Sequence, residues 1–101
     1  MKASEKKIGF IGFGHMAQIL FRALDRSRFV PRSKILFVRK DTEKMKRAEQ
    51  EFGITATSLK TLVAESDLIL LCVRPQQVDL VLGELSRVGV SGKKIVSIVA
   101  G

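Results

Sequence analysis

Small residues recur at the start, the middle and the end of one short segment, Gly12-Phe13-Gly14-His15-Met16-Ala17. Because glycine has no Cβ, Gly12 permits a tight turn and Gly14 lets a ligand approach the backbone closely. Ala17 would keep a following helix close to the preceding strand. Backbone N–H groups near Gly14, His15 and Met16, together with the dipole of that helix, would favour an anion. The chemistry that this segment predicts is the binding of a diphosphate.

The neighbouring sequence has the pattern that such a turn needs. An apolar run, 7–12, is typical of a buried strand that ends in the turn. Apolar residues then repeat at helical spacing on one face of 15–26. Strand, glycine turn and helix together are the context that gives this motif its meaning as a dinucleotide-binding turn. The alternative is that the glycines serve only a strand–helix connection.

A second candidate site follows the next predicted strand, 34–38. A domain specific for NAD usually places Asp or Glu there, to bind the ribose 2′-hydroxyl. Arg39 and Lys40 stand in that place instead, and an arginine can grip a 2′-phosphate with a fork of donors. The sequence therefore predicts NADP(H) as the preferred cofactor, with NAD(H) as a possible second. The alternative interpretation is two ordinary solvated charges.

Other residue types offer little chemistry. His15 is the single histidine and lies on the predicted phosphate turn, where a cap or a cofactor contact is expected rather than catalysis. Cys72 is the single cysteine and sits in an apolar run, as a buried inert thiol would. No cluster of His, Cys, Asp or Glu has metal-ligand spacing, and no Ser–His–Asp set can be assembled. We therefore predict neither a catalytic residue nor a metal site.

The whole chain alternates between predicted strands and predicted helices. The strands are 7–12, 34–38, 54–57, 68–73 and 94–99, and the helices are 15–26, 42–52, 58–63 and 75–85. Such alternation implies parallel strands, right-handed crossovers and helices on both sheet faces. We expect an α/β fold of the Rossmann type, a doubly wound, three-layer αβα domain over 1–101 with strand order 3-2-1-4-5.

Composition limits the partners and the location. Residues 1–50 hold 13 Lys and Arg against 5 Asp and Glu, so the net charge of +8 belongs to the first half. A basic half suits a nucleotide or a nucleic acid, but no nucleic-acid motif or aromatic platform is present, so none is expected to bind. The longest apolar run, 68–73, is too short to cross a membrane. Without a signal peptide and with one cysteine, the protein is expected to be cytoplasmic.

Three segments resemble the N-terminal half of pyrroline-5-carboxylate reductases. They begin at Ile8, Leu71 and Val96, and they read IGFIGFGHMA, LCVRPQ and VSIVAG. The resemblance covers the chain from Lys7 to Gly101 and implies NAD(P)H-dependent reduction of the C=N bond of 1-pyrroline-5-carboxylate to L-proline. In such an enzyme the residues that would hold the cofactor are Gly12, Phe13, Gly14, His15, Met16, Ala17, Arg39, Lys40, Val73, Arg74, Pro75, Ala100 and Gly101.

The resemblance also implies what lies outside this chain. An all-helical C-terminal domain in that family forms the dimer and most of the imino-acid site, so this chain by itself should bind the cofactor without turnover. His15 replaces the family's usual Asn and Arg74 its usual Lys, and both remain polar donors. The alternative function is a stand-alone NADP-binding or regulatory module that does not catalyse.

Overall fold

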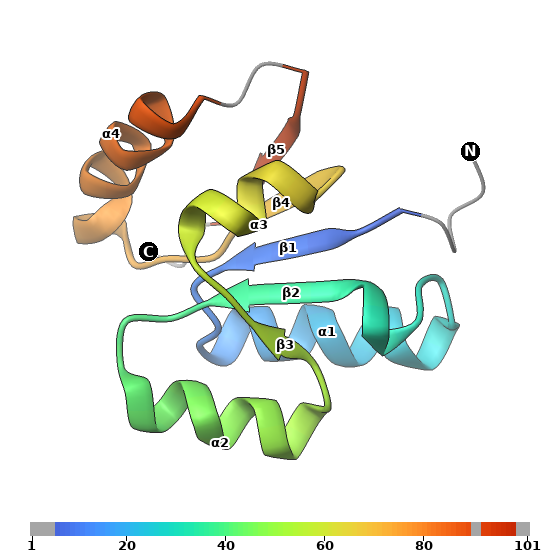
Figure 1. Cartoon of the computed structure of the whole chain (residues 1–101). Coiled ribbons are helices and arrows are strands. Elements are labelled where there is room, and N and C mark those ends of the chain that lie inside the picture. Colours follow the sequence, from blue (N-terminus) through green and yellow to red (C-terminus); the bar gives the residue numbers. More distant parts are fainter. Residues whose placement is uncertain (1–5, 90–91, 99–101) are drawn as a thin grey trace.

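The computed structural model describes residues 6–89 and 92–98. Strands and helices alternate along these residues (Figure 1). The strands are β1 (Ile8–Ile11), β2 (Ile35–Val38), β3 (Thr55–Ala56), β4 (Leu68–Leu71) and β5 (Lys94–Ser97). The helices are α1 (His15–Ser27), α2 (Thr42–Phe52), α3 (Leu59–Glu65) and α4 (Val78–Val88), with short 3₁₀ turns η2 (Arg32–Lys34) and η3 (Pro75–Gln77).

The strands form one parallel sheet in the order β3-β2-β1-β4-β5, which confirms the predicted strand order. Ile11 at the end of β1 pairs with Val38 on one side and Leu71 on the other. The three central strands therefore end level with one another. Loops that follow them meet at a single edge, at the point where the strand order reverses.

Helices cover both faces of the sheet, as expected for three layers (Figure 1). Helices α1 and α2 pack on one face, over a core that contains five of the six phenylalanines. Helices α3 and α4 pack on the other face through aliphatic side chains of their own, such as Leu62 and Leu85. On β5, by contrast, Val96 is 45% exposed. Among the described helices, none is both long enough and apolar enough to traverse a membrane.

Most element boundaries fall within two residues of the prediction, and the largest difference lies after β4. We expected helix from Pro75 onward, but the α-helix begins at Val78 after the 3₁₀ turn η3. Pro75 occupies the first position of that turn, where its missing N–H costs nothing. The residue before it, Arg74, is extended with ψ 152°, as the proline ring requires. The strand therefore ends at Leu71 instead of Val73.

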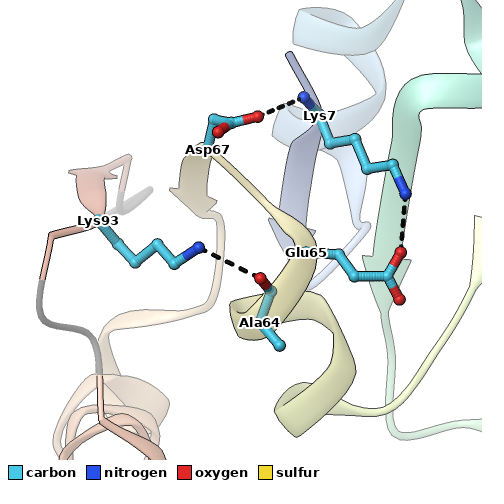
Figure 2. Close-up of polar contacts among 5 residues, drawn as sticks. All are labelled: Lys7, Ala64, Glu65, Asp67 and Lys93. Atoms are coloured by element: carbon cyan, nitrogen blue, oxygen red, sulfur yellow. Dashed lines mark hydrogen bonds and ion pairs between the residues drawn. The ribbon is translucent and has the colours of Figure 1, made fainter. Parts of the chain in front are cut away.

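Polar contacts hold together the opposite, amino edge of the sheet (Figure 2). The Lys7 ammonium forms an ion pair of 2.8 Å with Glu65, and the Lys7 backbone N–H donates to the Asp67 carboxylate at 2.9 Å. Lys93 Nζ donates to the Ala64 carbonyl at 3.3 Å and to the Ser66 carbonyl at 3.0 Å, at the C-terminal end of α3, where a cation is favoured. These contacts fix β1, α3 and β5 relative to one another.

Candidate nucleotide-binding site

A cavity of about 320 Å³ lies at the carboxyl edge of the sheet. Its floor is the glycine turn after β1, and its sides are the loops after β2 and β4. Helices α3 and α4 add a further wall. The cavity thus occupies the place where open parallel sheets bind their ligands.

Gly12 begins the turn under tight constraints. Its φ of +85° is one that L side chains rarely adopt, and a Cβ there would lie 2.5 Å from the Cys72 carbonyl oxygen. The Gly12 N–H donates to the Val38 carbonyl at 2.9 Å, which continues the pairing with β2 beyond its last residue. Only glycine fits, as the sequence predicted.

Gly14 is the opposite case, because a Cβ at this position would meet nothing within 4 Å. Gly14 lines the cavity and precedes α1 as its N-cap, yet no side chain caps the helix and its first turn holds no acidic residue. The first N–H groups of any α-helix have no partner inside the helix. An anion above Gly14 would therefore find room, free donors and no acidic side chain on the first turn of α1.

Phe13 lines the cavity through its position in the turn, while its ring belongs to the core. The side chain is 1% exposed and makes edge contacts with Phe10 and Phe52, at ring-centre distances of 5.5 and 5.3 Å. Its backbone carbonyl accepts hydrogen bonds from Arg39 Nη1 at 3.0 Å and from Gln18 Nε2 at 3.4 Å. A ligand in the cavity would therefore contact the backbone of Phe13, and the buried ring holds that backbone in place.

Cations gather on the β2 side of the cavity. Arg39 and Lys40, both predicted, line it together with Lys44, which the sequence analysis missed. Lys44 lies on the first turn of α2, and its backbone N–H donates to the Asp41 carboxylate at 3.1 Å. That bond holds the pKa of the Asp41 carboxyl below its ordinary value. Asp41 therefore serves as the cap of α2, and three cations face the cavity from the β2 side.

A capping pattern could have revealed Lys44. Asp41 directly precedes the predicted helix 42–52, and Asp is a preferred N-cap, so a residue three positions later stands on the first helical turn. Since α2 starts directly after β2, its first turn must lie at the carboxyl edge of the sheet. The wall from α3 and α4, with Leu59, Val81 and the half-buried Glu84, had no comparable local signal.

The loop after β4 closes the remaining side. Cys72, Val73 and Arg74 line the cavity, and the Cys72 N–H donates to the Ile11 carbonyl at 2.8 Å. Burial raises the pKa of the Cys72 thiol to about 11, so this thiol is neutral at physiological pH. Among the described residues, no three His, Cys, Asp or Glu side chains come together as a metal site would require.

The structure places most of the predicted residues around this one cavity. Those that line it are Gly12, Phe13, Gly14, Arg39, Lys40, Val73 and Arg74. His15 and Met16 are exposed at the start of α1, Ala17 is fully buried, and Pro75 opens η3, all outside the lining. Ala100 and Gly101 lie outside the described residues.

Comparison with known proteins identifies the family of the chain. The family model described as "NADP oxidoreductase coenzyme F420-dependent" matches residues 7–101. The chain belongs to this family. Curated relatives of this family member include the pyrroline-5-carboxylate reductase of Glycine max, 35% identical over 98% of the chain and 36% of the relative. That of Escherichia coli is 34% identical over 96% of the chain and 36% of the relative.

Solved structures show the same fold. A pyrroline-5-carboxylate reductase from Coxiella burnetii superposes with a TM-score of 0.81 at 24% identity, over 95% of the chain and 36% of that protein. The Plasmodium falciparum pyrroline carboxylate reductase, solved with NADP bound, gives 0.78 at 20% identity over 95% and 34%. At these identities the likeness concerns the fold alone. The chain spans about a third of the length of the relatives it matches.

The comparisons confirm three sequence-based predictions: the resemblance, the fold and the cofactor. The resemblance to pyrroline-5-carboxylate reductases holds, because these enzymes are homologues of the chain. The Rossmann-type fold holds as well. The family is one of NADP oxidoreductases, in agreement with the predicted cofactor. The imine reductase of a Pseudomonas species shares the fold with a TM-score of 0.71 at 23% identity, over 95% of the chain and 33% of that protein.

Proposed function

We propose that the protein to which this chain belongs is an NADPH-dependent imine reductase of the pyrroline-5-carboxylate reductase type, and that residues 1–101 form its nucleotide-binding domain. The observation that carries the proposal is the cavity at the carboxyl edge, where an uncapped helix start and three cations line the same space. Curated homologues with that activity name support the substrate class.

The pyrophosphate would lie over the glycine turn. Gly14 gives it room, because a side chain is absent and nothing else fills that space. The backbone of Gly12 and Phe13 shapes the turn, and the first N–H groups of α1, at His15 and Met16, add donors and the positive end of the helix dipole. Ala17, wholly buried, lets α1 pack closely on the sheet.

Arg39, Lys40 and Lys44 would neutralise the 2′-phosphate of NADPH. No carboxylate directly follows β2, and Asp41 is engaged as the cap of α2. A ribose 2′-hydroxyl thus lacks its usual acceptor at this position, whereas a 2′-phosphate meets three cations. We therefore propose a preference for NADPH over NADH.

The nicotinamide end would lie beside the loop after β4. Val73, Arg74 and Pro75 supply this side, and Ala100 and Gly101 are proposed to do so from the segment after β5. When bound, the cofactor would supply a hydride to the carbon of the C=N bond of 1-pyrroline-5-carboxylate, and a proton taken up by the nitrogen from solvent would complete L-proline. The chain's own residues bind and orient the cofactor, and none of them is assigned a proton-transfer role.

Further parts of the longer protein complete this proposal. A helical domain beyond this chain would bind the imino acid and join two subunits, since the chain spans about a third of its relatives. Hydride transfer needs donor and acceptor about 3–3.5 Å apart, so residues 1–101 alone should bind NADPH without turnover. We propose a cytoplasmic location for the enzyme, as expected from the sequence.

The decisive experiment measures NADPH oxidation by the full-length protein with 1-pyrroline-5-carboxylate. Turnover with this imine supports the proposal, and turnover only with other imines would reassign the protein to a sister reductase. Tight NADPH binding without turnover of any imine would point to a non-catalytic NADP-binding module. The cofactor preference is tested by comparing Lys40→Ala and Lys44→Ala with wild type, each of which should weaken NADPH binding more than NADH binding.

A further inference from the structure

Arg39 makes a contact with a residue distant in the sequence, which a side chain that only binds phosphate would not need. Its Nη1 donates to the Phe13 carbonyl oxygen at 3.0 Å, across 26 positions of sequence and in a partly buried setting. Arg39 itself is half-buried. The arginine after β2 is thus attached to the centre of the glycine turn after β1.

The peptide unit that Arg39 holds is the one between Phe13 and Gly14. A peptide unit is planar and trans, so its carbonyl and its N–H point in opposite directions. Fixing the Phe13 carbonyl therefore fixes the orientation of the Gly14 N–H. Gly12 is already held by its bond to Val38. At the Phe13 carbonyl, Arg39 makes the shorter of two bonds, at 3.0 Å against 3.4 Å for Gln18 Nε2.

The guanidinium retains donors after this bond. Arginine has five N–H groups, and among the residues that the structure describes the Phe13 carbonyl is the one acceptor bonded to them. Arg39 also lines the cavity beside Lys40 and Lys44. One side chain therefore contacts the pyrophosphate turn and faces the space assigned to the 2′-phosphate.

We propose that Arg39 is a positioning residue that couples the two phosphate subsites of the cofactor. Nη1 holds the Phe13–Gly14 peptide so that the Gly14 N–H is presented to the pyrophosphate, and the remaining N–H groups meet the 2′-phosphate. The inference rests on the proposed NADPH site. It assigns Arg39 a role in binding NADH as well, which a residue specific for the 2′-phosphate would not have.

Calorimetric titration with NADPH and NADH separates the two roles. Arg39→Ala should weaken NADH binding about tenfold and NADPH binding about a hundredfold, because it removes a charged donor from the turn and another from the phosphate. Arg39→Lys, which keeps a charge and a donor, should recover part of both losses. Lys44→Ala should weaken the binding of NADPH but not that of NADH. Lys46 is an exposed cation outside the cavity, so Lys46→Ala should change neither affinity.

A second measurement needs no ligand. Amide hydrogen exchange at Gly14 should accelerate in Arg39→Ala, less in Arg39→Lys, and not in Lys44→Ala. Unchanged Gly14 exchange, or unchanged NADH affinity in a folded Arg39→Ala, would overturn the inference even if NADPH binds as proposed. Should Arg39→Ala fail to fold, the Arg39→Lys comparison decides by the same criteria. A wild type that binds neither cofactor would refute the proposed function, while the exchange data would still judge the contact.

Discussion

At the scale of single residues, Gly12 and Gly14 lie in the same short turn but have different structural reasons for lacking a side chain. Gly12 has a positive φ and faces a backbone oxygen, so the fold itself requires it. Gly14 has an ordinary φ of −83° and open space where a side chain would be. The fold does not require glycine at 14, which leaves the ligand as the reason for its small size.

The first prediction compares these two positions. Gly14→Ala should lower the melting temperature only slightly, because alanine is a poorer N-cap than glycine. It should weaken NADPH binding at least about tenfold, because the added methyl occupies the space of the pyrophosphate. Gly12→Ala should lower the free energy of unfolding by about 2 kcal/mol or more, through backbone strain and contact with the Cys72 carbonyl. Calorimetry and thermal melts measure both. Undiminished NADPH affinity in Gly14→Ala would remove the pyrophosphate from this turn.

The Cys72 thiol allows a prediction of how its rate of alkylation depends on pH. Its pKa is raised to about 11 by burial, so at pH 8 its thiolate fraction should be about a hundredfold lower than that of a free cysteine. Alkylation by iodoacetamide should be correspondingly slow, and its rate should rise steeply with pH up to about 11. The same protein unfolded in urea is the matched control, since the chain has a single cysteine. Cys72 is half-buried rather than fully buried as predicted, and fast alkylation of the folded protein at pH 8 would contradict its raised pKa.

At the scale of elements, the site depends on how closely α3 packs on β1. A Cβ at Gly9 would lie 2.3 Å from Ser66 Oγ and 2.6 Å from a Leu62 methyl carbon. Ser66 is fully buried at the end of α3, and Leu62 faces the same core. The missing side chain at Gly9 therefore sets the distance between helix and strand, a role that motif analysis assigned only to Ala17 on the other face.

The second comparison of glycines follows from this packing. Gly9→Ala should destabilise the protein by about 1–3 kcal/mol, because α3 must move away from β1. Gly83→Ala, on α4 with no atom within 4 Å of the new methyl group, should stabilise it by up to about 1 kcal/mol through helix propensity. Urea unfolding of both variants measures the difference. Equal effects of the two substitutions would mean that α3 does not pack on Gly9 as described.

At the scale of the whole molecule, structural contacts and binding groups are kept at opposite edges of the sheet. The contacts of Lys7 and Lys93 tie elements together at the amino edge (Figure 2). The cations Arg39, Lys40 and Lys44 line the cavity at the carboxyl edge. A cavity formed by loops after three strands is complete only when the sheet is folded, so its ligand should bind the native state alone.

Ligand-linked stability tests this consequence. NADPH at a hundred times its dissociation constant should raise the free energy of unfolding by about 2.7 kcal/mol, as expected for a ligand specific to the native state. Thermal melts at increasing NADPH concentration measure the shift. Gly14→Ala at the same concentrations is the control, and its stabilisation should be at most about 1.4 kcal/mol, because its affinity is at least about tenfold lower. A shift of equal size in that variant would place NADPH elsewhere on the molecule.

The sequence by itself determined the alternation of strands and helices, the glycine turn and the missing carboxylate after β2. These features are local: hydrophobic periodicity and the absence of a side chain act within a few residues, whatever the rest of the chain does. Boundaries could be placed only within two or three residues, as the late start of α4 shows, because fraying and 3₁₀ turns depend on packing.

Only the tertiary structure decided how the side chains divide between core and cavity. The ring of Phe13 lies in the aromatic core while its carbonyl accepts from Arg39, 26 residues along the chain. Lys44 faces the same cavity, and α3 and α4 contribute Leu59 and Val81 as its wall. Sequence spacing cannot predict such contacts, because a side chain's direction is set by the packing of elements that are distant in sequence.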